Sequence, residues 1–374
     1  MTYKVCHITT AHDSDDVRIF RKECVFLAKN PDFDMYLIAP GNSRHEENVN
    51  VIGIGERPAN RLKRMFFFTK KALKCALSLD ADLYHFHDPE LLNVGLRLKK
   101  MGKAVVFDSH EITSEQIKIK TYIPKVLRNI ISKLYFYKET NVASTIDAVI
   151  IPCLYEGKNW FDKRSKRTVF VDNLPIINTE TAVSYKFDNS IYDLCTFGSL
   201  SPERGITQLL EARIITNATL VLGGDFSTID YKTKLEKQGL LKNVNYKGHC
   251  KPEDVEKYYK VSKIGMSTIL PVGQYVKAWN LPTKVYEFMS MGMPVILSKT
   301  PYVEQILKEF RFGIAVDTNS PKEIADAISY FLDNPEIAYS YGQEGRRAVV
   351  EKYNWEIEVI KIMNLYYQIL GNQV

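Results

Sequence analysis

Residues 277–298, KAWNLPTKVYEFMSMGMPVILS, predict a helix followed directly by a buried strand. Pro282 suits the first turn of that helix, because a missing N–H costs nothing there. Gly292 suits the end of the helix, and Pro294 prevents it from continuing into the apolar run 293–298. A helix that ends where a buried strand begins is typical of an α/β protein.

The same helix has one apolar side and one polar side. Val285, Phe288 and Met289 recur at helical spacing and predict the buried face. Lys284 and Glu287 lie off that face, in the first turns. A carboxylate there can accept both hydroxyls of a ribose, and a lysine beside a helix N-terminus can bind phosphate. A surface ion pair between the two residues is the alternative interpretation.

Short apolar runs alternate with amphipathic stretches along the whole chain, which predicts parallel sheets covered on both faces. The polar, aperiodic segment 173–190 separates two such series. We therefore expect two doubly wound Rossmann-like domains, an N-terminal one over 1–172 and a C-terminal one over 173–352. The runs are 3–10, 35–39, 82–87, 103–108, 147–152 and 167–172, then 192–198, 218–223, 243–247, 263–269, 293–298 and 313–316.

Composition narrows the class of protein further. With 45% hydrophobic and 25% charged residues among 374, the chain is neither disordered nor collagen-like. The six cysteines show neither paired nor zinc-finger spacing, so reduced thiols are expected. The first ten residues lack the apolar stretch of a secretory signal, and no apolar run is long enough to span a membrane. These features favour a cytoplasmic protein.

The basic residues are concentrated in the first half of the chain. Residues 1–172 hold 28 Lys and Arg against 21 Asp and Glu, whereas residues 173–374 hold 22 against 23. Segments 57–77 and 118–138 carry seven and six basic residues, no acidic one, and apolar residues at helical spacing. Such segments favour an anionic membrane surface, unless the apolar stripes pack on the sheet. No nucleic-acid-binding module is present, so nucleic acid is not expected as a partner.

The segment 198–205, GSLSPERG, follows an expected strand and opens a helix. Glycines at both ends let the backbone approach a ligand, and Arg204 adds a fork of donors suited to a diphosphate. A common strand-to-helix turn is the alternative. The phosphate-binding pattern GxxxxGK[ST] and a convincing GxGxxG are absent, which disfavours ATP hydrolysis and NAD chemistry.

Taken together, these motifs resemble those of retaining, family 4 glycosyltransferases of the two-lobed GT-B fold. The donor-binding half is matched by GSLSPERG (198–205), LVLGGD (220–225), NVNYKGH (243–249), NLPTKVYEFMSMGMPVI (280–296) and YNW (353–355). A bacterial branch that builds cell-surface polysaccharides is matched by HDSDDVRIFRKE (12–23), YHFHDPELL (84–92) and VVFDSHE (105–111). The resemblance implies two domains facing across a cleft, with the C-terminal helix 353–374 returning to the N-terminal domain.

The resemblance also implies a donor site in the second half of the chain. Arg204 and Lys284 would hold the donor diphosphate, and Glu287 would hold its ribose. The remaining pocket residues would be Gly198, Ser199, Gly224, Asp225 and Thr283. Two positions depart from the family pattern: Ser199 replaces the usual arginine of the clamp loop, and Trp279 replaces a glutamate eight residues before Glu287.

In the first half, His110 matches the family histidine that reaches toward the transferred sugar. Residues on the sugar or acceptor side would be Asp16, Arg18, His87, Asp88 and Glu90. Asp88 followed by Pro89 is equally suited to start a helix, with the aspartate as its N-cap.

The expected activity is metal-independent glycosyl transfer with retention, in capsule, exopolysaccharide or O-antigen biosynthesis. The donor would be a UDP- or GDP-sugar, bound as a substrate, with no cofactor and no metal. The acceptor would be a glycan or a polyprenyl-diphosphate-linked glycan, and the enzyme would lie on the inner face of the cell membrane. Two alternatives remain open: a nucleotide-sugar epimerase of the same fold, and a non-catalytic sugar-nucleotide-binding partner of another transferase.

Overall fold

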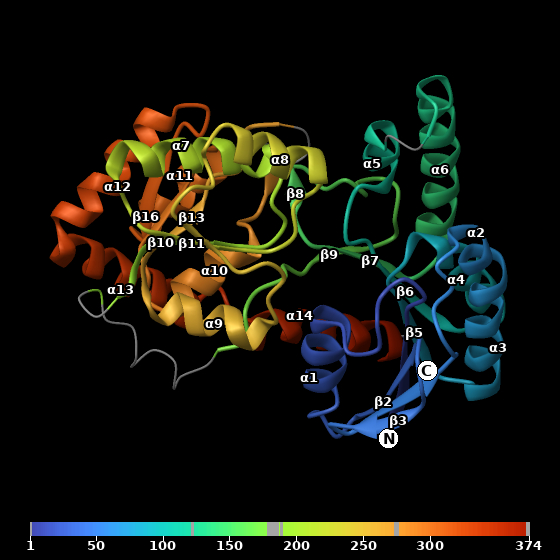
Figure 1. The fold of residues 1–374 in the computed structure, drawn as a ribbon. Helices are drawn as coiled ribbons and strands as arrows, with labels where there is room; N and C mark the ends of the chain where they lie inside the picture. Colours follow the sequence, from blue (N-terminus) through green and yellow to red (C-terminus); the bar gives the residue numbers. More distant parts are fainter. Residues whose placement is uncertain (1, 121–122, 178–186, 188–189, 273–276, 372–374) are drawn as a thin grey trace. The chain divides into compact units, whose positions relative to one another are not determined.

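The computed structural model describes residues 2–120, 123–177, 187, 190–272 and 277–371. The chain divides into two compact units, Met1–Asn173 with Glu356–Val374, and Leu174–Trp355 (Figure 1). Each unit is built on one largely parallel sheet with helices on both faces. The expectation of two doubly wound α/β domains is therefore confirmed.

The first unit contains an eight-stranded sheet in the order β3-β4-β2-β1-β5-β6-β7-β9. Its neighbouring strands are parallel except for β3 and β4. The strands are β1 (Tyr3–Ile8), β2 (Phe33–Ala39), β3 (Arg44–Glu46), β4 (Val49–Gly53), β5 (Leu83–Phe86), β6 (Ala104–Asp108), β7 (Ala148–Ile151) and β9 (Thr168–Phe170). A two-residue strand, β8 (Leu154–Tyr155), lies outside this sheet.

The antiparallel β3–β4 hairpin was not predicted from the sequence. Its turn residues, Glu47 and Asn48, have φ angles of 51° and 61°. Two consecutive positive φ angles are typical of the two-residue hairpin turn whose twist matches that of the strands. The turn carries no glycine and β3 is a polar strand of three residues, so the sequence contains little signal for the hairpin.

Helices cover both faces of the first sheet (Figure 1). Cys6 and Ile8 of β1 join the apolar core formed with α3, α4 and α6. Because side chains alternate along a strand, His7 points to the opposite face, which η1 and α14 cover. The helical elements are η1 (Val17–Cys24), α1 (Val25–Leu27), α2 (Arg61–Lys63), η2 (Arg64–Phe68), α3 (Thr69–Leu79), η3 (Pro89–Leu91), α4 (Leu92–Lys100), α5 (Thr113–Ile119), α6 (Lys125–Thr145) and α14 (Trp355–Gly371).

The last helix, α14, packs on the first unit although it follows the second unit in sequence. Glu358 accepts a hydrogen bond from the backbone N–H of Asp172 at 2.9 Å. Tyr366, fully buried, lies with its hydroxyl 2.9 Å from His7 Nε2. The C-terminal helix thus completes one face of the N-terminal sheet.

The second unit contains a six-stranded sheet in the order β12-β11-β10-β13-β15-β16. All neighbouring strands in it are parallel. The strands are β10 (Tyr192–Phe197), β11 (Leu220–Gly223), β12 (Val244–Tyr246), β13 (Ser262–Ser267), β15 (Val295–Ser298) and β16 (Gly313–Val316); the short β14 (Ala278–Trp279) lies outside the sheet. Every apolar run predicted from the sequence overlaps a strand of one of the two sheets.

Figure 1 shows α7, α11 and α12 on one face of the second sheet and α9, α10 and α13 on the other. Val285, Phe288 and Met289 of α10 are fully buried, as their spacing predicts. The helical elements are η6 (Pro202–Arg204), α7 (Ile206–Thr216), α8 (Ile229–Lys237), α9 (Pro252–Lys260), α10 (Thr283–Ser290), α11 (Pro301–Glu309), α12 (Pro321–Asp333) and α13 (Pro335–Glu351).

In both sheets the strand order reverses beside the first strand. The reversal lies between β1 and β5 in the first unit and between β10 and β13 in the second. At such a point the connections leave in opposite directions, which opens a crevice at the carboxyl ends of the strands. The candidate functional residues of each unit lie near these ends, in the loops or on neighbouring helices.

Candidate functional site

The second unit contains a cavity of about 1080 Å³ at the carboxyl ends of β10, β11 and β13. It is lined by side chains and backbone from all of the pocket positions expected in this half of the chain. These are Gly198, Ser199, Arg204, Gly224, Asp225, Thr283, Lys284 and Glu287. Residues up to 89 positions apart in sequence therefore come together around one space.

Two glycines shape the wall of this cavity. Gly198 and Gly224 both have a φ angle of 123°, a conformation that strains any other residue. A Cβ atom on Gly224 would lie 1.8 Å from the carbonyl oxygen of Gly198, so the two loops require glycine to approach each other. A Cβ on Gly198 would meet no atom within 4 Å, because this position opens into the cavity.

Lys284 places a cation in the cavity wall. Its amine donates a hydrogen bond to Thr196 Oγ1 at 3.0 Å. Burial and the nearby positive charge of Arg204 lower the pKa of Lys284 to about 8, although the carboxylate of Glu287 acts in the opposite direction. Among the ion pairs of the described residues, none joins Lys284 to Glu287. Lys284 and Glu287 both line the cavity, and their role in donor binding stays a prediction.

Glu287 accepts a hydrogen bond from the hydroxyl of Tyr259 at 3.0 Å. Burial and the Glu287 carboxylate both raise the pKa of this tyrosine well above its usual value, so it stays a donor. The phenol orients the carboxylate in the cavity wall. Tyr259 lies on α9, 28 residues from Glu287, and no sequence pattern had linked the two.

Two other positions clarify the departures from the family pattern. Ser199 lines the cavity, but Trp279 is not among its lining residues. The Trp279 ring instead lies 6.0 Å from that of Tyr302. Asp225 and His249, which both line the cavity, form a pair with 2.8 Å between Oδ2 and Nδ1. This pairing was not predicted.

In the first unit, Asp88 connects two strand ends. Its Oδ2 atom accepts hydrogen bonds from Thr9 Oγ1 and from the backbone N–H groups of Thr10 and Ala11. Asp88 occupies the N-cap position of η3, yet its side chain makes no capping hydrogen bond. A helix does begin at Asp88 and Pro89, as the alternative expected, but the carboxylate fixes the loop after β1 rather than capping that helix.

Arg18 and Asp108 form a buried pair beneath these loops. Arg18 donates from Nε to Asp108 Oδ2 at 3.1 Å and from Nη2 to Oδ1 at 3.2 Å. Burial alone would raise the pKa of Asp108, but the Arg18 and His110 charges hold it well below its usual range. With 8% of its surface exposed, Arg18 positions a carboxylate rather than presenting its charge to a ligand.

Asp16 and Glu90 are also engaged with protein groups. Asp16 caps η1 by accepting from the backbone N–H groups of Arg18 and Ile19. Burial opposes ionisation of Asp16, but hydrogen bonds from His12 and these amides lower its pKa overall. Glu90 accepts from Arg64 Nε at 2.9 Å and forms an ion pair with it.

His110 is the partly exposed member of this group. Its Nε2 lies 3.1 Å from Asp108 Oδ2, with 22% of its side chain exposed. His87, by contrast, is 1% exposed, and its Nδ1 lies 3.3 Å from His110 Nε2. A buried carboxylate thus orients an accessible imidazole, a geometry suited to stabilising charge or moving a proton.

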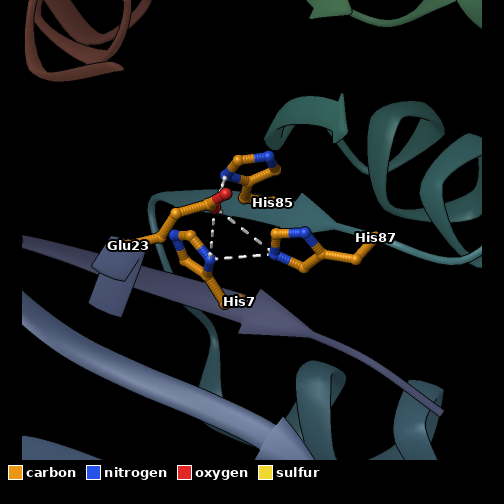
Figure 2. A group of neighbouring side chains, drawn as sticks. All are labelled: His7, Glu23, His85 and His87. Carbon is orange, nitrogen blue, oxygen red and sulfur yellow. Dashed lines mark hydrogen bonds and ion pairs between the residues drawn. The ribbon is translucent and has the colours of Figure 1, made fainter. Parts of the chain in front are cut away.

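Behind His87 lies a buried cluster that sequence reasoning missed: His7, Glu23, His85 and His87 (Figure 2). His7 and His85 are register partners on β1 and β5. Histidines inside two apolar strand runs were the available signal, but their pairing follows only from the sheet. Glu23 comes from η1, whose contact with these strands no local pattern predicts.

Comparisons with known proteins agree with this geometry. Residues 24–170 match the family model "Glycosyltransferase Family 4", and residues 179–348 match "Glycosyl transferases group 1". The chain is a GT-B glycosyltransferase. It is 20% identical to an uncharacterized glycosyltransferase of Methanocaldococcus jannaschii, with 92% of each chain covered.

Solved GT-B structures resemble it over nearly the whole length. Sucrose-phosphate synthase from Thermosynechococcus elongatus superimposes with a TM-score of 0.75 at 16% identity, covering 99% of this chain and 100% of the other. Anabaena HepE in complex with UDP-glucose gives a TM-score of 0.69 at 15% identity, covering 98% and 100%. These likenesses establish the fold of the glycosyltransferase.

We predict that Arg18→Gln destabilises the first unit by about 3–5 kcal/mol, because it leaves the buried Asp108 charge without its bidentate partner. Arg21→Gln serves as the matched control. Arg21 lies on the same helix but is half-exposed, and its ion pair with Glu46 is long at 3.6 Å. Its loss should therefore cost about 1 kcal/mol or less of unfolding free energy. Urea unfolding of both variants measures the difference. Equal stabilities would contradict a structural role for the Arg18–Asp108 pair.

Proposed function

We propose that this glycosyltransferase moves a sugar from a nucleoside-diphosphate sugar to a lipid-linked glycan at an anionic membrane, with retention of the anomeric configuration. The observation that carries the proposal is the cavity of the second unit. It combines two cationic side chains, two glycine-lined loops and a carboxylate held by Tyr259. HepE, which shares the fold, is named as a complex with UDP-glucose, which supports a uridine nucleotide as the first donor to try.

Each part of the cavity suits one part of such a donor. Arg204 supplies a planar fork of donors for the diphosphate, and Lys284 adds a point charge. Thr283 begins α10, whose first N–H groups also favour a negative charge. The Glu287 carboxylate accepts hydrogen bonds from the ribose hydroxyls. Burial disfavours the charged form of Lys284 and lowers its pKa. A diphosphate beside the amine supplies the negative charge that stabilises this form, so its binding there is strongly favoured.

The same groups account for the leaving step without a divalent ion. As the bond between the anomeric carbon and the phosphate oxygen breaks, negative charge builds on the diphosphate, where Arg204 and Lys284 stabilise it. The acceptor hydroxyl attacks the same face and gives its proton to a departing phosphate oxygen. His110, oriented by Asp108, stabilises the sugar as positive charge develops on it.

The acceptor side of the proposal rests on the surface of the first unit. The stripe of α6 formed by Val126, Ile130 and Leu134 is 80%, 56% and 65% exposed. Phe66 and Phe67 of η2 are 61% and 66% exposed, within a segment that carries seven basic residues. Leu73 and Leu77 of the same basic segment pack against the core, so only its exposed side chains and those of α6 can enter the headgroup region of an anionic leaflet.

None of the helices among residues 2–120, 123–177, 190–272 and 277–371 is long and apolar enough to cross a bilayer. We propose peripheral attachment on the cytoplasmic face of the membrane, where nucleotide sugars and polyprenyl-diphosphate acceptors meet. The biosynthesis of a cell-surface polysaccharide is the corresponding pathway.

We predict that Glu287→Ala and His110→Ala separate donor binding from transfer. Loss of Glu287 removes a charge-assisted contact worth about 1.5–3 kcal/mol, so UDP or GDP should bind roughly tenfold to a hundredfold more weakly. His110→Ala should leave that affinity nearly unchanged and lower turnover. Calorimetric titration and nucleotide release from candidate donors, in EDTA, measure the two effects.

Tyr259→Phe is the matched control, since it keeps the Glu287 charge and should weaken nucleotide binding less than Glu287→Ala. Unchanged affinity in a folded Glu287→Ala protein would refute the donor site. Activity that is lost in EDTA and restored by manganese but not by Zn²⁺ would refute the metal-free leaving step. The product distinguishes the alternatives: a lengthened glycan indicates transfer, an epimerised donor indicates an epimerase, and binding without turnover indicates a regulatory protein.

We predict that nucleotide affinity falls as the pH rises through about 8. Lys284 is charged below its pKa of about 8 and neutral above it, so binding of a diphosphate takes up one proton in the alkaline range. The dissociation constant should rise up to about tenfold per pH unit. Lys284→Arg should abolish this dependence because a guanidinium stays charged. A flat profile for the unmodified protein between pH 7 and 9.5 would contradict the assignment.

We predict that the full chain binds vesicles containing phosphatidylglycerol in preference to neutral phosphatidylcholine vesicles, and that salt weakens the binding. Replacing Val126, Ile130 and Leu134 by serine should remove most of it. Ile229→Ser is the control, since Ile229 is 83% exposed in the second unit. Flotation measures bound protein. Equal binding to both vesicle types, or an effect of Ile229→Ser as large as that of the triple variant, would contradict the membrane surface.

A further inference from the structure

The buried cluster of His7, Glu23, His85 and His87 has no role in the proposed transfer. We refer to it as the histidine–glutamate cluster. His7, Glu23 and His85 have no exposed surface, and His87 is 1% exposed. Figure 2 shows the Glu23 carboxylate directed at the three imidazole rings. Four polar side chains so deeply buried need partners that offset their lost hydration.

The spacing of the atoms in this cluster is that of ligands around one ion. His7 Nδ1 lies 3.0 Å from His87 Nε2 and 3.6 Å from Glu23 Oε2. Glu23 Oε2 lies 3.8 Å from His87 Nε2 and 3.9 Å from His85 Nδ1. Zinc bonds of about 2.0–2.1 Å in a tetrahedron place neighbouring ligand atoms about 3.3–3.4 Å apart. The four separations above range from 3.0 to 3.9 Å, and all four ligand atoms lie within 4.8 Å of one another, so small side-chain shifts bring them to that geometry.

The protein supplies no sufficient partner for Glu23. Neither of its carboxylate oxygens accepts a hydrogen bond within the described part of the chain. Arg18 Nε lies 3.2 Å from Oε1, but its hydrogen bond goes to Asp108. One guanidinium therefore faces two buried carboxylates, Glu23 and Asp108.

The outer ring nitrogens of two histidines have the partners that metal ligands commonly have. His87 turns Nδ1 to the Asp108 carboxylate at 3.4 Å, which leaves Nε2 facing the cluster. His7 turns Nε2 to the hydroxyl of Tyr366 at 2.9 Å, which leaves Nδ1 facing the cluster. If Asp108 accepts from His87 Nδ1 and the Tyr366 hydroxyl accepts from His7 Nε2, both inward nitrogens carry a lone pair, and the ion then replaces the present hydrogen bond between His7 Nδ1 and His87 Nε2.

We propose that His7, Glu23, His85 and His87 bind one divalent first-row transition ion, with Zn²⁺ as the best match. Imidazole nitrogens with one carboxylate suit such an ion, whereas Mg²⁺ and Ca²⁺ prefer oxygen ligands. His85 Nδ1, now 2.7 Å from the Tyr366 hydroxyl, exchanges this contact for the ion. Four protein ligands leave no open position for a substrate. The ion therefore joins β1, β5, η1 and, through Tyr366, α14, and it supports the Asp108–His110 pair from behind.

Zinc titration of the full chain, without an affinity tag, tests this site. The protein is stripped of metal and titrated with Zn²⁺ against a chromogenic chelator, and Co²⁺ serves as a spectroscopic probe. We expect one Zn²⁺ per chain and the visible absorption of four-coordinate Co²⁺. Glu23→Gln and His7→Gln should each weaken Zn²⁺ binding by at least about 100-fold, and Tyr366→Phe by about tenfold.

His45→Gln is the matched control. His45 is an exposed histidine of β3 that bonds to Asn50, so its loss should leave the affinity unchanged. Zn²⁺ should also raise the melting temperature of the stripped protein, because it binds only the folded state. The melting shift of the unmodified protein tests the zinc site even if the cluster variants fail to fold. Absence of both Zn²⁺ binding and a melting shift would overturn the proposal, as would equal affinity in Glu23→Gln, His7→Gln and the unmodified protein.

Discussion

The reversal of strand order beside the first strand of each sheet is the constraint on which the functional groups of this protein depend. In a parallel sheet every connection covers one face or the other, and only at the reversal do two neighbouring connections leave in opposite directions. The crevice is framed by β1 and β5 in the first unit and by β10 and β13 in the second. Side chains and amides at these strand ends can meet a ligand without disturbing either apolar core.

The crevices of the two units present different functional groups. In the second unit, Arg204 and Lys284 place positive charge in an open cavity, and the glycines at 198 and 224 keep the backbone close to it. In the first unit, Arg18 is buried and matched to Asp108, so the accessible group is the imidazole of His110. The first arrangement suits a diphosphate that must be held. The second suits a sugar or a proton that must be stabilised briefly.

The sequence predicted what depends on local pattern. Apolar runs located the strands of both sheets, and the resemblance of the loop motifs to a known family located the residues of the cavity. It could not predict contacts that arise only when distant elements pack. Arg18 and Glu23 on η1 meet strand ends more than 60 residues away, and Tyr366 reaches His7 from the end of the chain.

The exposed stripe on α6 is a second feature that the sequence pattern alone could not predict. Its periodicity is that of a buried helix face, and only the structure shows that Val126, Ile130 and Leu134 remain uncovered. Figure 1 shows α6 extending past the strands of the first sheet, with α5 beside its far part. A pattern in sequence identifies an apolar face, whereas the neighbouring elements decide whether that face is core or contact surface.

The central claim is that the crevice of the second unit binds the donor diphosphate. Amide hydrogen exchange of the full chain with and without UDP tests it most directly, with GDP as the second probe. Exchange should slow in residues 198–205, 223–225 and 283–287, which surround the cavity, while the exchange of α6 is unchanged. Protection confined to the loops of the first unit, with none in these three segments at saturating nucleotide, would contradict the account.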